Sequence, residues 1–176
     1  MTDPAPKQFK KSERKDIHTI SILVANKPGV LSRIATIFAR RAYNIDSLVV
    51  SPTLDGHFSR MTITAIGELK TLEQIIKQLN KLVDVIHASE HKREDVIDTE
   101  FALIKVRTTN ETRVGILQCV DHFKGKTVDF TDESLVIQVT GSTEKLDAMV
   151  EMLFKYGVLE MVRSGKMIMA RGGETT

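Results

Sequence analysis

The sequence predicts an α+β fold made of two ferredoxin-like β-α-β-β-α-β domains in tandem. Apolar residues alternate along short runs, which is typical of half-buried strands, and recur at helical spacing between those runs. The resulting order of elements is β-α-β-β-α-β. The same order recurs after a charged segment, residues 92–98, which we expect to be a linker.

The first domain is expected over residues 17–91. Ile20, Ile22 and Val24 alternate with polar residues, as in a strand with one buried face. An amphipathic helix is expected to begin near Pro28, because proline is tolerated in a first helical turn. Strands are then expected over 43–52, 57–66 and 83–90, with a helix lined by Leu72, Ile75, Ile76, Leu79 and Val83 before the last strand. Polar alternate positions in these strands predict a sheet with one uncovered face.

The second domain is expected over residues 99–172. Its strands are predicted over 101–106, 127–130 and 134–140, with a closing hairpin of 158–161 and 167–170. Its helices are predicted over 113–123, with Val114, Leu117 and Val120 inward, and around Leu146, Met149, Val150 and Leu153. Domains of this size are only marginally stable, so we expect pairing within or between chains.

The ends and the composition exclude several classes of protein. Residues 1–16 are expected to form a flexible basic arm and residues 173–176 a tail; we favour a solvated arm over nucleic-acid contact. The net charge of +2 over 176 residues gives no broad basic surface for nucleic acid. No apolar run approaches the ~20 residues that span a membrane, and no secretory signal is present. The sequence therefore predicts a cytoplasmic protein.

Catalytic signatures are missing from the sequence. There is no glycine-rich nucleotide loop and no Walker A run. His87 and His91 lack a third metal ligand nearby, and Asp121 and His122 diverge on a predicted helix. Cys119 lies in an apolar helical stretch and is expected to be a buried structural thiol. We expect no catalytic residue, no metal site and no cofactor bound by this chain.

One segment, residues 26–31 (Asn-Lys-Pro-Gly-Val-Leu), has the features of a binding site. A strand ends there and a helix begins, so the N–H groups of Gly29, Val30 and Leu31 lack intrahelical acceptors. Gly29 permits close backbone approach, and the helix dipole favours a carboxylate. Asn26 offers either a side-chain amide to the ligand or a cap to the helix. From the residues alone, a binding site and a simple helix-starting turn both remain open.

Residues 26–34 and 38–48 resemble the ACT domain of the acetohydroxyacid synthase small-subunit family, and the resemblance continues through 59–62 and 72–85. Residues 125–129, 141–148 and 163–165 resemble that family's C-terminal domain. Two alternatives to this family are weighed. A stand-alone ACT-type sensor, such as a transcriptional regulator, would need a DNA-reading helix pair, which is not found. A small ferredoxin-like enzyme would need an assembled catalytic group.

The resemblance implies a non-catalytic regulatory subunit. It implies a homodimer through the ACT domains, a catalytic large-subunit partner that carries thiamine diphosphate, Mg²⁺ and FAD, and feedback inhibition by a branched-chain amino acid, typically valine. The effector carboxylate would be held in one protomer, and Asn44 and Ile45 would approach from the other, offering a carbonyl to the ammonium and an apolar contact. The effector-binding residues that it implies are Asn26, Pro28, Gly29, Val30, Leu31, Asn44 and Ile45.

Overall fold

The computed structural model describes residues 17–173 and 175–176, so the expected basic arm, residues 1–16, lies outside the described residues. Contacts divide the described chain into two units. The first unit contains residues 17–98 and 165–176, and the second contains residues 99–164. Each unit is described separately below.

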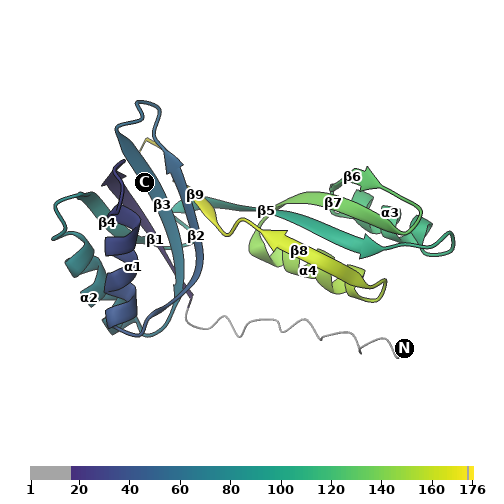
Figure 1. Cartoon of the computed structure of the whole chain (residues 1–176), viewed down its shortest axis with the longest axis horizontal. Helices are drawn as coiled ribbons and strands as arrows, with labels where there is room; N and C mark the ends of the chain where they lie inside the picture. The colour runs from purple at the N-terminus through teal and green to yellow at the C-terminus, as the bar shows by residue number, and fades with distance from the viewer. Residues whose placement is uncertain (1–16, 174) are drawn as a thin grey trace. The chain divides into compact units, whose positions relative to one another are not determined.

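The first unit has the predicted ferredoxin-like order. Its elements are β1 (Ile17–Ala25), α1 (Val30–Arg40), β2 (Asn44–Pro52), β3 (Phe58–Ile66), α2 (Leu69–Leu79) and β4 (Val85–His91). The strands form an antiparallel sheet in the order β2-β3-β1-β4. Both helices lie on one face of that sheet (Figure 1). The alternating residues Ile20, Ile22 and Val24 are buried beneath them, as the pattern predicts.

The opposite face of this sheet is covered in part, so the expected uncovered face was wrong. Ser21, Thr62 and Thr64 are polar yet at most 5% exposed. A segment that contains β9 (Met167–Ala170) lies on this side of the sheet (Figure 1). A Cβ atom added to Gly165 would lie 2.5 Å from the Ser47 side chain, and the φ angle of Gly165 is +81°. The close approach therefore requires a glycine above a small hydroxyl residue.

The second unit repeats the order of elements. It contains β5 (Val96–Arg107, which begins in the first unit), α3 (Arg113–His122), β6 (Lys126–Phe130), β7 (Ser134–Gly141), α4 (Thr143–Phe154) and β8 (Val158–Arg163). The strand order is β6-β7-β5-β8, and the two ferredoxin-like halves are confirmed.

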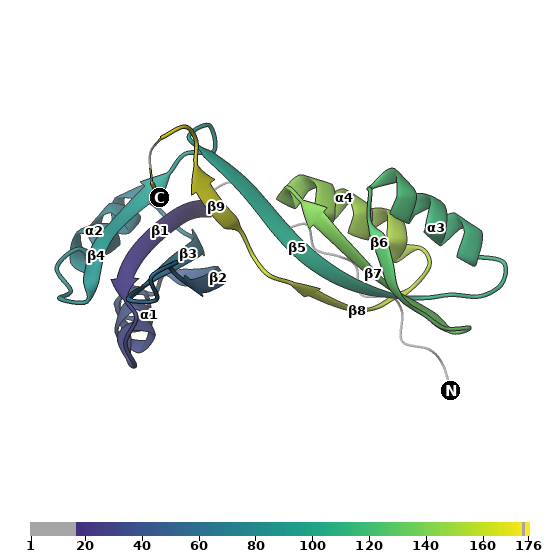
Figure 2. The same ribbon diagram turned by 90° about the horizontal axis from the view of Figure 1, so that it is seen from above.

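Three details differ from the sequence predictions. Strand β5 begins at Val96, within the segment 92–98 that was expected to be a linker, because buried Val96 and exposed Ile97 already alternate. The predicted hairpin of 158–161 with 167–170 is wrong, since β8 and β9 each pair with β5 (Figure 2). Residues 165–172, expected in the second domain, belong to the first unit.

Helix α3 also turns differently from the prediction. Val114 was expected to face inward but is 63% exposed, whereas Ile116, Cys119 and Val120 are buried. These three residues follow the i, i+3, i+4 spacing of one helix face, which directs Val114 away from the core.

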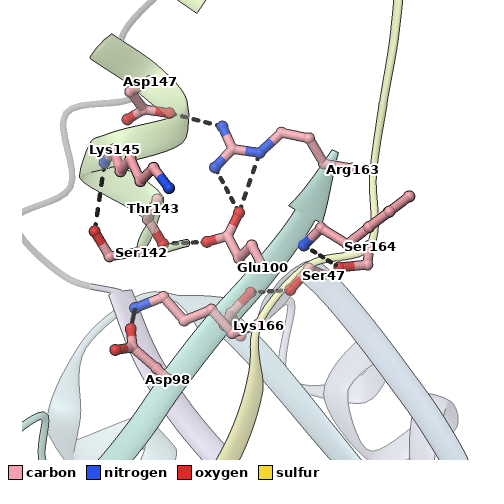
Figure 3. A network of polar contacts seen from close by, with 12 residues as sticks. Ser47, Asp98, Glu100, Ser142, Thr143, Lys145, Asp147, Arg163, Ser164 and Lys166 are labelled. Atoms are coloured by element: carbon pink, nitrogen blue, oxygen red, sulfur yellow. Dashed lines mark hydrogen bonds and ion pairs between the residues drawn. The ribbon is translucent and has the colours of Figure 1, made fainter. Parts of the chain in front are cut away.

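A buried ion-pair network joins β5, β8 and α4 in the second unit (Figure 3). The Arg163 guanidinium donates to Glu100 Oε2 through Nη2 at 2.5 Å and to Asp147 Oδ1 through Nη1 at 2.6 Å. Thr143 Oγ1 donates to the other oxygen of Glu100. Burial alone would lower the pKa of Arg163, but the hydrogen bonds and charges of Asp147 and Glu100 outweigh it and raise that pKa. The arginine therefore stays charged between two buried carboxylates.

We predict that Arg163→Met lowers the free energy of unfolding of the second unit by about 3–5 kcal/mol, because it leaves two carboxylates buried without a cation. Urea unfolding of the full chain, followed with a probe in residues 99–164, measures this loss. Lys126→Met is the control, because it removes an exposed cation of the same unit. A loss equal to that of the control would contradict the role assigned to the network.

Candidate functional site

The loop between β1 and α1 is held in place by backbone contacts. Asn26 N donates to His57 O at 2.9 Å, and Lys27 N donates to Ala25 O at 2.9 Å. The Asn26 side chain adds a hydrogen bond from Nδ2 to Gly56 O at 3.1 Å. The loop is therefore fixed against the turn that joins β2 to β3.

Gly29 starts helix α1 in a left-handed conformation, with φ +82° and ψ −8°. An added Cβ atom at Gly29 would meet no atom within 4 Å, so the space in front of this residue is open. The first hydrogen bond of the helix runs from Arg33 N to Gly29 O at 3.2 Å. Within the described residues, the N–H groups of Gly29, Val30 and Leu31 have no hydrogen-bond acceptor. Such groups at a helix N-terminus, together with the helix dipole, suit a carboxylate.

The side chains around this turn differ in burial and in the groups that they contact. Val30 is 2% exposed and anchors the helix in the core, whereas Leu31 is 43% exposed beside the open amides. Asn26 makes no cap of the helix, so that interpretation was wrong; its amide binds the β2–β3 turn instead. Pro28 lies exposed in the turn, and the helix begins two residues later at Val30, close to the expected start.

Asn44 and Ile45 lie at the other end of the sheet. Asn44 pairs with Ile66, the last residue of β3, whereas the loop at Asn26 adjoins the residues that precede Phe58, the first residue of β3. The nine residues of β3 span about 27 Å at about 3.4 Å per residue. Asn44 is exposed, and Ile45 is half-buried against the core.

One protomer therefore does not bring all seven predicted residues together. Residues 26–31 form one group, and Asn44 and Ile45 form another at the opposite end of the same sheet. A ligand that touches both groups needs a second copy of the chain, placed so that the start of its β2 lies beside the loop.

Two contacts at this site were not predicted from the sequence. Arg33, whose side chain is 54% exposed, forms an ion pair with Asp84 at 2.9 Å between Nη1 and Oδ2. Asp84 also accepts a hydrogen bond from Ala25 N at 2.8 Å through its backbone oxygen. These contacts tie α1 and the end of β1 to the residue before β4. No spacing in the sequence connects positions 33 and 84, because only the sheet brings them together.

Two other residues considered in the sequence, Cys119 and His91, lie outside this loop. Cys119 is buried in the second unit. His91 Nε2 lies 2.6 Å from Ser21 Oγ and 3.2 Å from Ser89 Oγ. Over residues 17–173, 175 and 176, no cluster of three or more His, Cys, Asp or Glu side chains could hold a metal ion. In the same range, no helix is both long enough and apolar enough to cross a bilayer.

Comparison with known proteins matches both halves of the chain. Residues 20–87 match the model of the AHAS small subunit-like ACT domain, and residues 99–172 match the model of the small subunit of acetolactate synthase. The acetolactate synthase small subunit of Mycolicibacterium smegmatis is 46% identical over 155 residues, which cover 88% of this chain and 91% of that relative. This chain belongs to the acetolactate synthase small-subunit family.

Further relatives agree with the assignment to the acetolactate synthase small-subunit family. The probable small subunit of Archaeoglobus fulgidus is 43% identical over 89% of this chain and 98% of its own length. The crystal structure of the small subunit from Thermotoga maritima aligns with a TM-score of 0.81 and 39% identity, over 90% of this chain and 99% of that one. The first unit thus contains the ACT domain of a small subunit, and the loop 26–31 lies in that domain.

The partly buried His91 generates a prediction about pH. Burial lowers the pKa of His91, the nearby His87 lowers it further, and Asp95 acts in the opposite direction. Because the folded pKa lies below 6.5, the unfolded chain binds more protons as the pH falls below about 6.5. We therefore predict that stability decreases from above pH 6.5 down to the folded pKa, and that His91→Gln reduces this slope. Urea unfolding across this pH range measures it. An NMR titration that gives His91 a pKa at or above 6.5 would contradict the argument.

Proposed function

We propose that the chain is the non-catalytic regulatory subunit of acetolactate synthase. It binds a catalytic large subunit, raises the activity of that subunit, and inhibits it when a branched-chain amino acid binds to the ACT domains. Valine is the first candidate for that amino acid. We expect the assembly in the cytoplasm and the thiamine diphosphate, Mg²⁺ and FAD on the large subunit.

The observation that carries the proposal is the open first turn of α1 in a chain of this family. The free N–H groups of Gly29, Val30 and Leu31 offer hydrogen bonds to the carboxylate of an amino acid. The exposed side chain of Leu31 lies next to these donors and offers apolar contact. The carbonyl of Asn44 and the side chain of Ile45, from a second protomer, would receive the ammonium and the aliphatic side chain.

A homodimer through β2 would complete this site. β2 is an edge strand, so one of its sides has no neighbouring strand. Ile45, Leu48 and Val50 lie on the face of β2 that the helices cover. Val50 is 44% exposed, and an edge strand with free backbone groups is a template for pairing. Antiparallel pairing of two β2 strands about a two-fold axis would place the start of one strand beside the end of the other. In this arrangement, Asn44 of one protomer would lie near the loop 26–31 of the other.

We predict that Val50→Lys dissociates the dimer, because it places a charge on the apolar face of the paired strands. Sedimentation equilibrium at micromolar concentration, with and without valine, measures the change. Ile86→Lys is the matched control, since Ile86 is 55% exposed on β4, the other edge strand. If Ile86→Lys dissociates the protein and Val50→Lys does not, the dimer forms through β4. A wild-type monomer under both conditions would exclude the dimer altogether.

We also predict that Gly29→Asp abolishes valine inhibition of the reconstituted holoenzyme but leaves activation of the large subunit largely intact. The aspartate would stand in front of the free amides and repel a carboxylate. Loss of two charge-assisted hydrogen bonds would weaken binding by about a hundredfold or more. A valine titration of holoenzyme activity measures the effect.

Two variants separate the causes of that effect. Gly29→Asn has nearly the same size and tolerates the left-handed conformation, so it tests the negative charge alone. Gly172→Asp adds a charge at a glycine that also has positive φ and open space, but lies outside the loop. An unchanged inhibition curve for Gly29→Asp would place the effector elsewhere. Loss of activation together with inhibition would indicate a folding or docking defect.

A further inference from the structure

A second small-molecule pocket lies in the first unit, on the sheet face opposite α1 and α2. Its volume is about 730 Å³, within the usual range for ligand sites. The turn between β2 and β3 forms one side of it, and the segment 167–169 forms the other. None of residues 26–31, Asn44 or Ile45 lines it, so it is separate from the proposed effector site.

The walls of this pocket are largely apolar and exposed. Leu54 is fully exposed, Met169 is 65% exposed and Met167 is 39% exposed. Val49 and Pro52 add further apolar surface from β2. Apolar side chains that gather around a hollow, rather than scatter singly, are typical of a binding surface.

Arg60 supplies a cation with an unused donor. It stands on β3 between Leu23 of β1 and Ser51 of β2, on the same face as Thr62. Its Nη1 donates to Thr176 Oγ1 at 3.0 Å, whereas its Nε is buried and, among the described residues, has no hydrogen-bond partner. A buried donor without a partner costs free energy, which an acceptor atom of a ligand would recover.

The charges around Arg60 favour a ligand with one negative charge. Within the described part of the chain, no carboxylate forms an ion pair with Arg60. Asp55 also lines the pocket but is exposed. A hydrogen bond from Thr53 lowers the pKa of Asp55, so it is ionised at neutral pH and opposes a second negative charge on the ligand. Its own attraction for an ammonium group is screened by water.

We propose that this pocket binds a small aliphatic monocarboxylate, with the carboxylate on Arg60 and Thr62 and the apolar chain against Val49, Met167 and Met169. The carboxylate pairs with the guanidinium of Arg60 in a charge-assisted hydrogen bond. The aliphatic chain packs against Met167 and Met169, whose flexible side chains adapt to different apolar shapes. The proposal does not depend on the effector site or on the partner subunit.

Octanoate is the probe for this pocket, titrated into the full chain by calorimetry and followed by NMR of the methionine methyl groups. We expect saturable binding that shifts Met167 and Met169. Octanol, which has the same chain and no charge, should bind at least about tenfold more weakly, and so should octanoate to Arg60→Met. Arg40→Met is the matched control, because Arg40 is exposed on α1, on the opposite side of the sheet.

Several results would overturn the proposal. They are no binding to the full chain, equal affinity for octanol, or unchanged affinity in Arg60→Met. If Arg60→Met does not fold, Thr62→Val should still weaken octanoate binding. Tighter binding of the α-amino analogue of octanoate would assign the site to an amino acid held by Asp55. Binding only to Thr176→Val would show that the chain itself fills the pocket.

Gly29→Asp separates this proposal from the proposed function. It should leave octanoate binding unchanged while it removes valine inhibition. Loss of both effects in Gly29→Asp would show that octanoate and valine share one site, and would overturn the second pocket.

Discussion

Every feature of the first unit depends on the two faces of one small antiparallel sheet. The apolar face, with Ile20, Ile22 and Val24, needs the cover of α1 and α2, and it supplies the core. The other face carries several Ser and Thr residues, such as Ser21, Ser47 and Thr64, which are short enough for another segment of chain to lie directly on them. A bulky residue at Ser47 would push away the backbone at Gly165, because no Cβ fits there. The small residues thus place the segment 165–170, and with it one wall of the second pocket.

The same sheet determines what the loop 26–31 can do. Antiparallel strands put the β1–α1 loop and the β2–β3 turn at one end and the start of β2 at the other. The loop is anchored by Asn26, whose side chain holds the β2–β3 turn at Gly56, and by the buried Val30. Gly29 then turns the chain so that its amides face open space. The donors for a carboxylate are therefore backbone groups, which every side-chain replacement except proline leaves in place, so steric or electrostatic obstruction is the direct test.

The sequence predicted the order of elements because periodicity depends on local contacts. The alternation at Ile20, Ile22 and Val24 and the helical spacing from Val30 to Phe38 both follow from which residues must be buried. The prediction from sequence failed where segments that are far apart in the chain pair with each other. The pairing of β9 with β5 cannot be recognised in residues 167–170, whose short alternating run would fit a hairpin with β8 equally well. Val114 was placed inward because three apolar residues fitted a helix face, and Ile116 and Cys119 fitted a better one.

The candidate site, too, could be predicted only where it depends on local sequence. The open amides at Gly29 were predictable, since a proline-glycine turn before a helix leaves them without acceptors. The role of Asn26 was not, because the same side chain serves as a helix cap or as a tie to a neighbouring turn, and the choice depends on Gly56. Arg33 pairs with Asp84, and Arg60 pairs with Thr176; each partner is likewise far away in the sequence.

The separation of Asn44 from the loop has a consequence for regulation. If an amino acid touches residues of two protomers, its binding and the association of the protomers are linked, and each stabilises the other by mass action. Backbone amides alone accept any carboxylate, so selectivity for an amino acid must come from the acceptor and the apolar contact supplied by the second copy. A site of this kind responds to its effector only in the assembled state. The Arg60 pocket differs, because every group that lines it belongs to one chain, and it needs no partner to be complete.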